Sequence, residues 1–306
     1  MDDVTDFGLR AAAERGCVRA QYTLGNMYRT GEGVQQNSET AVMWYTKAAE
    51  QGHAEAQSNL GNMYRAGVGV QQDDETAVMW YTKATEQGLM EAQYNLGSMH
   101  DTGEGVQQDD ETAVMWYTKA AEQGYAKSQC NLGFMYFTGR GVQQDYKAAV
   151  MWYTKPAEQG LVEAQYNLGA MYLNGVGVQQ DDETAVMWYT KAAEQGCTNS
   201  QFRLGVMYGA GRGVQKDSKT AVVWFTKAAE QGHATAQFNL GVMYRTGGGV
   251  QQDYETAVMW LTKAAEQGYA NAQFNLGFMY DTGEGVQQNS ETAVMWFTKA
   301  AEQGVV

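Results

Sequence analysis

The segment AVMWYTKAAEQG returns along the chain at a fixed interval. It fills residues 41–52, 113–124 and 185–196, and near-copies stand at five equivalent places. All eight tryptophans keep the same spacing of 36 residues, from Trp44 to Trp296. A fixed period of this length is typical of a solenoid, in which stacked copies of a small unit bury a continuous core. The period therefore predicts one elongated array, and not the two globular domains that 306 residues would otherwise suggest.

The period divides the chain into eight complete units without an insertion or deletion. Residues 1–16 resemble a degenerate second half-unit, and residues 305–306 form a tail. The complete units are 17–52, 53–88, 89–124, 125–160, 161–196, 197–232, 233–268 and 269–304. We expect residues 17–304 to form a single solenoid domain.

Each unit contains two segments with helical periodicity. In the second unit, apolar residues at 56, 60, 63 and 64 form the stripe of an amphipathic helix. After a break with two glycines, a second helix begins near Asp73 or Asp74, either of which suits an N-cap. Gly88 suits the left-handed position after the helix end. A single proline among 306 residues also fits a mostly helical, all-α chain.

Two residues inside these helices are unusual. Gly61 stands in the middle of a first helix, where glycine costs about 1 kcal/mol relative to alanine, yet a glycine recurs there in every unit. We expect the tryptophan of the second helix to pack against it. Pro156 replaces an alanine in the last turn of a second helix, where it should kink or fray the helix end.

The repeated pattern resembles the Sel-1-like repeat, a relative of the tetratricopeptide repeat. It reads Ala-Gln-x-Asn-Leu-Gly-x-Met-Tyr, then Gly-x-Gly-Val, then Ala-x-x-Trp-Tyr-x-Lys-Ala-Ala-Glu-Gln-Gly, and residues 164–196 show it almost complete. The resemblance implies a right-handed superhelix of antiparallel helix pairs, an α/α solenoid. It also implies a non-catalytic adaptor that binds a protein or peptide in a concave groove lined by first helices. Fold alone does not fix function.

Two other functions stay open at this point. Some cysteine-rich relatives have been credited with hydrolase activity, and a solenoid can also serve as a structural spacer. The cysteine-rich branch joins each helix pair by a disulfide, but this chain has only Cys17, Cys130 and Cys197. Cys17 and Cys197 lie five units apart, beyond disulfide reach. The cysteine content therefore disfavours that branch and an extracellular setting.

Charge and composition limit the partners. The formal net charge of −14 opposes binding to nucleic acid or an anionic membrane and favours basic proteins or peptides. No run of 18 apolar residues occurs, and the first residues lack the basic and apolar regions of a signal peptide. A cytoplasmic location is the default expectation.

Catalytic and metal-binding patterns are missing from the sequence. The three histidines, His53, His100 and His233, have no metal-type spacing to cysteines or carboxylates. No Ser/His/Asp or Cys/His set can be assembled. Acidic clusters such as 109–111 stand where second helices begin, which favours helix capping over cation binding. We therefore expect no enzyme activity, no metal and no cofactor.

The copies differ chiefly on one face of the first helix. In the second unit the variable positions are Glu55, Ser58, Asn62 and Arg65, whose spacing of 3, 4 and 3 draws a single face. In related solenoids this face lines the concave groove, so the resemblance supports a binding surface.

An asparagine precedes Leu-Gly in six of the eight units. These ladder asparagines are Asn59, Asn95, Asn131, Asn167, Asn239 and Asn275, with Thr23 and Arg203 as the exceptions. Because each amide donates and accepts hydrogen bonds, the ladder could hold an extended peptide backbone, a position resembling the clamp asparagine of tetratricopeptide modules. The alternative is that the amides tie neighbouring first helices together.

The character of the variable face changes along the array. Arg29 and Arg65 are basic, the middle units are apolar, and Arg245 follows before Asp281. The apolar residues are Phe134, Phe137, Ala170 and Leu173. An apolar centre with charged flanks resembles a protein-binding patch, so we expect a peptide segment to bind near units four and five. Drift among duplicated units is the alternative.

The last unit ends in a complete second helix with no polar capping helix after it, although solenoid ends usually need one. We expect either a longer array or end-to-end self-association through this repeat.

Overall fold

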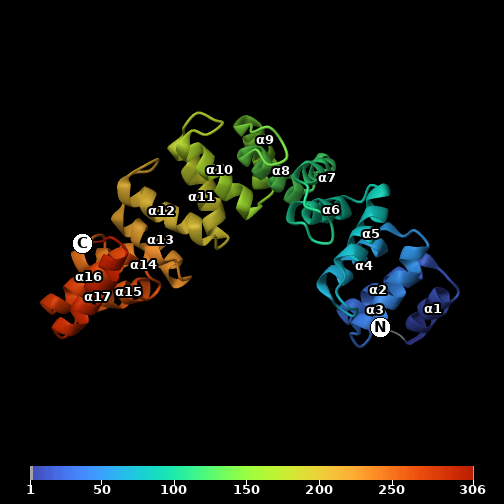
Figure 1. Ribbon diagram of the computed structural model, residues 1–306, viewed down its shortest axis with the longest axis horizontal. Coiled ribbons are helices and arrows are strands. Elements are labelled where there is room, and N and C mark those ends of the chain that lie inside the picture. The colour runs from blue at the N-terminus through green and yellow to red at the C-terminus, as the bar shows by residue number, and fades with distance from the viewer. Residues whose placement is uncertain (1–2, 306) are drawn as a thin grey trace. The chain divides into compact units, whose positions relative to one another are not determined.

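The computed structural model describes residues 3–305, and its side chains are described from residue 8 onward. Seventeen α-helices and no strand occur in residues 3–305 (Figure 1). Helix α1 spans Asp3–Glu14. The first helices of the eight units are α2 (Val18–Thr30), α4 (Ala54–Ala66), α6 (Met90–Thr102), α8 (Ala126–Thr138), α10 (Val162–Asn174), α12 (Thr198–Ala210), α14 (Ala234–Thr246) and α16 (Ala270–Thr282). The second helices are α3 (Ser38–Glu50), α5 (Asp74–Glu86), α7 (Asp110–Glu122), α9 (Tyr146–Glu158), α11 (Asp182–Glu194), α13 (Ser218–Glu230), α15 (Tyr254–Glu266) and α17 (Ser290–Glu302).

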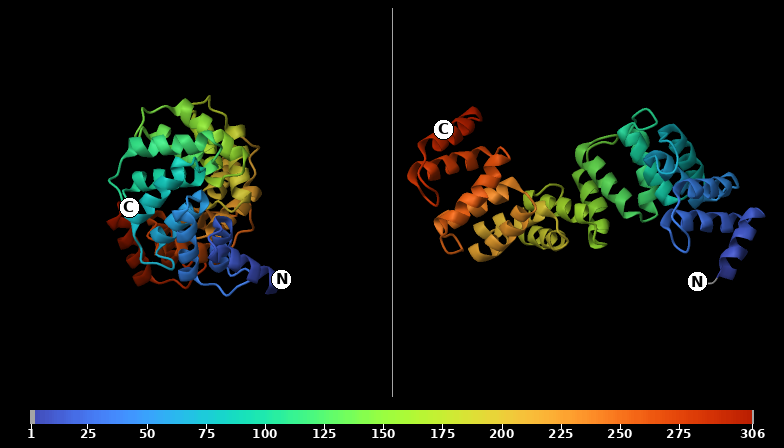
Figure 2. Two further views of the ribbon diagram at one scale, coloured as in Figure 1. Left: turned by 90° about the vertical axis from the view of Figure 1, so that its right-hand side faces the viewer. Right: turned by 90° about the horizontal axis from the view of Figure 1, so that it is seen from below.

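Consecutive helix pairs pack side by side, as an all-α solenoid requires. The chain divides into two compact units, residues 1–156 and 157–306. Within each unit, first and second helices alternate along the chain and each pair lies against the next (Figure 2). The predicted fold class is confirmed, whereas a single domain over residues 17–304 stays a prediction.

Side-chain caps and glycines set the helix bounds. Asp73 is the N-cap of α5 and accepts a hydrogen bond from the backbone N–H of Thr76 at 3.0 Å. The Thr76 hydroxyl donates to the same carboxylate at 2.7 Å. Gly88 follows the end of α5 with a φ of +79°, which favours glycine. Both predicted boundaries of this helix are therefore confirmed, with Asp73 as the capping residue.

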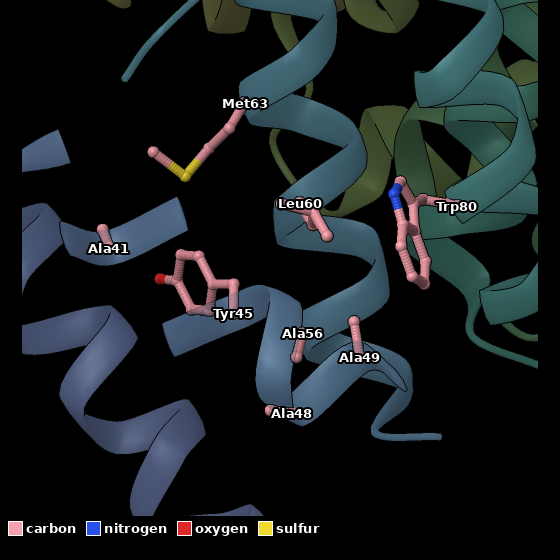
Figure 3. Packing of buried hydrophobic residues seen from close by; sticks show 8 residues of the cluster. All are labelled: Ala41, Tyr45, Ala48, Ala49, Ala56, Leu60, Met63 and Trp80. Carbon is pink, nitrogen blue, oxygen red and sulfur yellow. The ribbon is translucent and has the colours of Figure 1, made fainter. Parts of the chain in front are cut away.

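The core of each repeat is built around a leucine of the first helix. Leu60 of α4 lies between Tyr45 of α3 and Trp80 of α5, which are on opposite sides of α4 (Figure 3). All three side chains are buried together with Ala49 and Met63. The tryptophan of one repeat therefore packs against the repeat before it as well as against its own first helix.

The expected contact between the tryptophan and the mid-helix glycine is wrong. A Cβ added to Gly61 would lie 2.7 Å from Cε1 of Tyr81, the residue that follows Trp80. Adjacent residues of a helix point about 100° apart, so only one of the two rings can face the glycine. The tyrosine faces its own first helix, and the tryptophan faces the preceding repeat.

A seam of buried glutamines connects successive repeats. Gln57 donates from Nε2 to the carbonyl of Ala49 at 3.0 Å and accepts at Oε1 from Gln87 Nε2 at 2.9 Å. Gln237 makes the same two bonds, with Ala229 and Gln267. Because buried amides need partners, this seam fixes the register of each helix pair on its neighbour.

Pro156 does not fray its helix. Helix α9 continues past it to Glu158, the position at which the other second helices end. A proline in the last turn removes a single backbone donor, and its φ is compatible with helix. The expected fraying of the helix end is therefore wrong, whereas a kink at Pro156 stays a prediction.

Candidate protein-binding site

The variable face of the first helices is only partly open. In α4, Glu55 is exposed, but Ser58 is buried and its hydroxyl has no hydrogen-bond partner. Asn62 is half-buried and accepts a hydrogen bond from the Tyr81 hydroxyl at 2.6 Å. The predicted face therefore combines surface positions with positions that hold the two helices of a repeat together.

The ladder asparagines are mostly engaged within the chain. Asn95 is buried and donates to Oδ1 of Asn62 at 3.2 Å. Asn275 donates to the carbonyl of Asn271 at 2.8 Å and accepts from Arg245 at 2.8 Å. The alternative interpretation, that these amides tie neighbouring first helices together, describes both contacts directly.

The other ladder asparagines differ in their contacts. Asn59 lies near the Tyr45 hydroxyl and Asn131 near the Tyr117 hydroxyl, where each opposes the rise in pKa that burial gives the tyrosine. All four asparagines outside positions 95 and 275 are half-buried. Peptide binding by the ladder remains a prediction.

The three basic residues expected on this face have partners in the chain. The Nε of Arg29 donates to the Tyr45 hydroxyl at 3.2 Å. Arg65 donates to Oε2 of Glu104 at 2.7 Å. The charge of Arg65 is therefore paired within the chain, whereas Arg29 contacts a neutral hydroxyl and keeps an exposed positive charge.

Arg245 is engaged in the same way. Its Nε lies 3.3 Å from Oε2 of Glu284, and its guanidinium stacks 4.8 Å above the ring of Phe278. A partner reaching Arg245 would have to compete with both contacts.

The apolar residues expected in the middle of the array lie in different settings. Phe134 and Phe137 of α8 are 46% and 37% exposed, and the Phe137 ring meets Tyr146 edge-on at 5.5 Å. Leu173 of α10 is only 8% exposed and packs in the core with Tyr189 and Leu204. Phe134 and Phe137 belong to the first compact unit and Leu173 to the second, so each set is considered by itself.

Exposed apolar side chains also occur on first helices of the second compact unit. Val206 of α12 and Phe278 of α16 are exposed at the position that Phe134 occupies in α8. Both residues lie at multiples of 36 from Phe134, so their equivalence to it is visible in the sequence. Comparing the eight copies at the position of Phe134 identifies Val206 and Phe278 as apolar residues at the same place.

A second exposed row runs along the second helices and was also missed. Its members are Met43, Met79, Met115, Met151, Met187, Met259 and Met295, with Val223 in the remaining copy. The residue that follows each methionine is a buried or half-buried tryptophan. In seven of the eight copies a lysine ammonium lies over the tryptophan ring, as that of Lys47 does over Trp44 at 4.5 Å from the ring centroid. Because the second helices are nearly identical in all copies, a comparison of copies does not separate this exposed row from the core residues.

The acidic starts of the second helices act as caps. Asp109 accepts hydrogen bonds from the backbone N–H groups of Glu111 and Thr112 and from the Thr112 hydroxyl. These bonds hold the pKa of Asp109 below its ordinary value, the side-chain bond from Thr112 being the largest cause. The capping interpretation is confirmed. Across the described residues, no group of three or more histidines, cysteines and carboxylates could hold a metal ion.

None of the helices described is both long enough and apolar enough to span a bilayer.

Comparisons with known proteins place the chain among helical repeat proteins. The sequence model of the Sel1 repeat matches eight times, at residues 18–53, 54–89, 91–125, 126–161, 162–197, 198–233, 234–269 and 270–305. A comparison with curated proteins found no match.

Two crystal structures are similar over nearly the whole chain. One is a protective antigen present in uropathogenic Escherichia coli strains that displays an SLR fold. It is 43% identical with a TM-score of 0.94, over 97% of this chain and 64% of that chain. The other is a Sel1 repeat protein from Oxalobacter formigenes, 35% identical with a TM-score of 0.73, over 97% of this chain and 86% of that chain. The chain thus spans less than two thirds of the Escherichia coli protein.

Proposed function

Because this chain belongs to the Sel1 repeat family, we propose that it is a non-catalytic scaffold that binds a protein or peptide segment on its first helices. Sel1 repeat proteins are generally protein–protein interaction scaffolds. Membership of the family supports a scaffold role in general. The choice of the first helices as the binding surface rests on the residues of this chain.

One observation supports the choice of the first helices. The copies are nearly identical along the second helices and differ along the exposed positions of the first helices. At the differing positions of α8, Phe134 and Phe137 expose aromatic rings to solvent. Aromatic residues are enriched in protein interfaces and contribute a large share of binding energy there.

Crosslinking mass spectrometry on complexes captured from the source cells tests this proposal. We expect crosslinks to concentrate on first-helix residues. Replacing Phe134 and Phe137 together by aspartate should weaken capture of the crosslinked partner at least about tenfold, because aspartate cannot replace a buried aromatic contact.

The matched control is Met79→Asp with Met115→Asp in the same compact unit. These methionines are exposed to a similar degree, 43% each, but lie on second helices. Circular dichroism confirms that both double variants fold. Crosslinks confined to the second helices, or equal loss of capture in both double variants, would contradict the proposal.

A further inference from the structure

In each of the first three repeats, the tyrosine hydroxyl of the second helix donates to an acceptor on its own first helix. The donor–acceptor pairs are Tyr45 with Asn26 Oδ1 at 2.6 Å, Tyr81 with Asn62 Oδ1 at 2.6 Å, and Tyr117 with Asp101 Oδ2 at 3.4 Å. The acceptor precedes the tyrosine by 19 residues in the first two pairs and by 16 in the third. A buried hydroxyl normally has such a partner.

The fifth repeat lacks this acceptor. Tyr189 is the equivalent residue, and the positions 19 and 16 residues before it hold Ala170 and Leu173, which offer no polar side-chain atom. The side chain of Tyr189 is fully buried, and its hydroxyl has no hydrogen-bond partner among the described residues. The fold therefore keeps a buried donor here that no described residue satisfies.

Arg203 of the next repeat brings further donors to the same place. It occupies the ladder position. At the junction of the second and third repeats, Oδ1 of Asn62 accepts from the Tyr81 hydroxyl at 2.6 Å and from the ladder residue Asn95 at 3.2 Å, so the ladder residue lies close to the tyrosine hydroxyl of the preceding repeat. The same placement next to Tyr189 agrees with the effect of the Arg203 charge, which opposes the burial that raises the pKa of Tyr189. Arg203 is exposed and makes no ion pair or hydrogen bond with any described side chain.

The Tyr189 phenol and the Arg203 guanidinium both lack a hydrogen-bond acceptor, so a ligand that binds here should supply one. Neutral and cationic donors that converge are complementary to a carboxylate, which accepts from several donors at once. Val206 lies one turn beyond Arg203 on α12 and is 40% exposed, so an apolar side chain can pack there. The Arg203 guanidinium lies 6.0 Å from the centre of the Phe202 ring, a distance at which a cation–π contact is weak, so the side chain can turn to admit a carboxylate to the hydroxyl beneath the surface.

We propose that Tyr189 and Arg203 form a carboxylate-binding site for a peptide that carries an aspartate or glutamate next to an apolar side chain. The inference rests on the proposed scaffold function and specifies the chemistry of the peptide. It assigns the carboxylate to Arg203 and Tyr189 and the apolar side chain to Val206. The site would bind an acidic peptide, although the net charge of −14 on the whole chain favours basic partners.

The test uses three fluorescein-labelled peptides in which leucine alternates with glutamate, glutamine or lysine. Fluorescence anisotropy measures their binding to the full chain. We expect the glutamate peptide to bind about tenfold more tightly than the glutamine peptide, the size of effect that a charge-assisted pair gives. The lysine peptide should bind more weakly than the glutamine peptide.

The chain itself supplies variants that should fold. Arg203→Asn introduces the residue found at six equivalent positions, and Tyr189→Phe introduces the residue found at Phe225. Arg203→Asn should remove the preference for glutamate, and Tyr189→Phe should reduce it several-fold without changing binding of the glutamine peptide. The control Lys216→Gln removes an exposed positive charge of the same compact unit, and seven other repeats have glutamine there. It should leave the preference intact.

Each result bears on a different statement. Equal binding of the glutamate and glutamine peptides, or an equal effect of Arg203→Asn and Lys216→Gln, overturns the carboxylate site. If Val206→Asp then abolishes binding of both peptides, the first-helix face survives as a peptide-binding surface without the carboxylate preference. If no peptide binds, the carboxylate inference is rejected, and the crosslinking experiment alone decides the scaffold function.

Discussion

At the scale of single residues, the closest packing in each repeat is between a bare helix backbone and a ring. Gly25, Gly61 and Gly97 lie against Tyr45, Tyr81 and Tyr117, so a side chain at these glycines would meet the ring. In later repeats the opposing side chain is Phe225, Leu261 or Phe297, and the glycine is still required. The contact therefore needs a large side chain against the glycine, and tyrosine, phenylalanine or leucine can supply it.

Gly61→Ala should destabilise the protein. The added methyl group would lie within 3 Å of the Tyr81 ring, and such overpacking costs about 1–3 kcal/mol, which exceeds the gain of up to about 1 kcal/mol in helix propensity. Urea unfolding followed by circular dichroism measures the net loss. Gly209→Ala is the control, because its added methyl group would meet nothing closer than the Ala221 Cβ at 3.8 Å. Gly209→Ala should be neutral or stabilising, and equal losses in the two variants would contradict the packing argument.

At the scale of whole helices, the two kinds of helix are capped differently. Asparagine or aspartate caps all the second helices for which the cap is described, whereas only His53 and His233 cap a first helix through a side chain. The Nδ1 of His233 accepts from the backbone N–H of Ala236 at 3.1 Å, and its ring stacks on Phe202 at 4.5 Å. A histidine cap works only while the imidazole is neutral, because a protonated ring has no acceptor.

The stability of the seventh repeat should therefore fall as the pH falls through about 6.5. Burial, followed by the charge of Arg203, lowers the pKa of His233 below its ordinary value of 6.5. A depressed histidine pKa means that the unfolded chain binds the proton more tightly, so the contribution is fully present above 6.5 and is lost below it. The carboxylate caps titrate below 3.8 and do not contribute in this window.

Urea unfolding of the wild type and of His233→Tyr, between about pH 7.5 and pH 5.5, measures this effect. Tyrosine stands at the equivalent places 125 and 269 and makes no side-chain cap there. The wild type should be the more stable at the higher pH, and the difference should narrow at the lower pH. A difference that is independent of pH would show that the imidazole does not act as a titrating cap.

At the scale of the whole molecule, ion pairs join several neighbouring repeats, and the arginine belongs to the earlier repeat in some pairs and to the later repeat in others. Arg65 pairs with Glu104, and Arg245 with Glu284, whereas Asp101 pairs with Arg140 in the opposite sense. The two partners are 39 residues apart in the sequence in all three pairs. In a solenoid, where each repeat contacts only its neighbours, such pairs contribute to the interfaces that make unfolding cooperative.

Reversing one charge of the pair Arg65–Glu104 should cost stability, and reversing both should restore it. The side chains are 30% and 44% exposed, so the coupling energy should be modest, about 0.5–1 kcal/mol. A double-mutant cycle with Arg65→Glu and Glu104→Arg, measured by urea unfolding, isolates it. A coupling energy that is indistinguishable from zero would show that this pair does not join the repeats.

The period and the helical patterns were sufficient to predict the architecture. The contacts of the candidate site were harder, because they depend on residues one repeat away. Asn95 looked free in the sequence but is buried against Asn62, and Arg65 is paired with Glu104. Neighbouring helix positions such as Trp80 and Tyr81 both point inward, so periodicity could not tell which one faces the glycine. The regular period also gave no sign of two compact units, apart from Pro156 at their boundary.

The glutamine seam has a consequence for how such a protein changes in evolution. Gln57 and Gln237 make the same pair of bonds five repeats apart, so deleting or duplicating a whole unit rebuilds a junction that already exists. No new core contacts are needed, because each helix pair can pack against the neighbours of any other pair. What such an event does change is the order in which the first-helix side chains are presented. Recognition can therefore be altered by recombination of whole units as well as by point substitution.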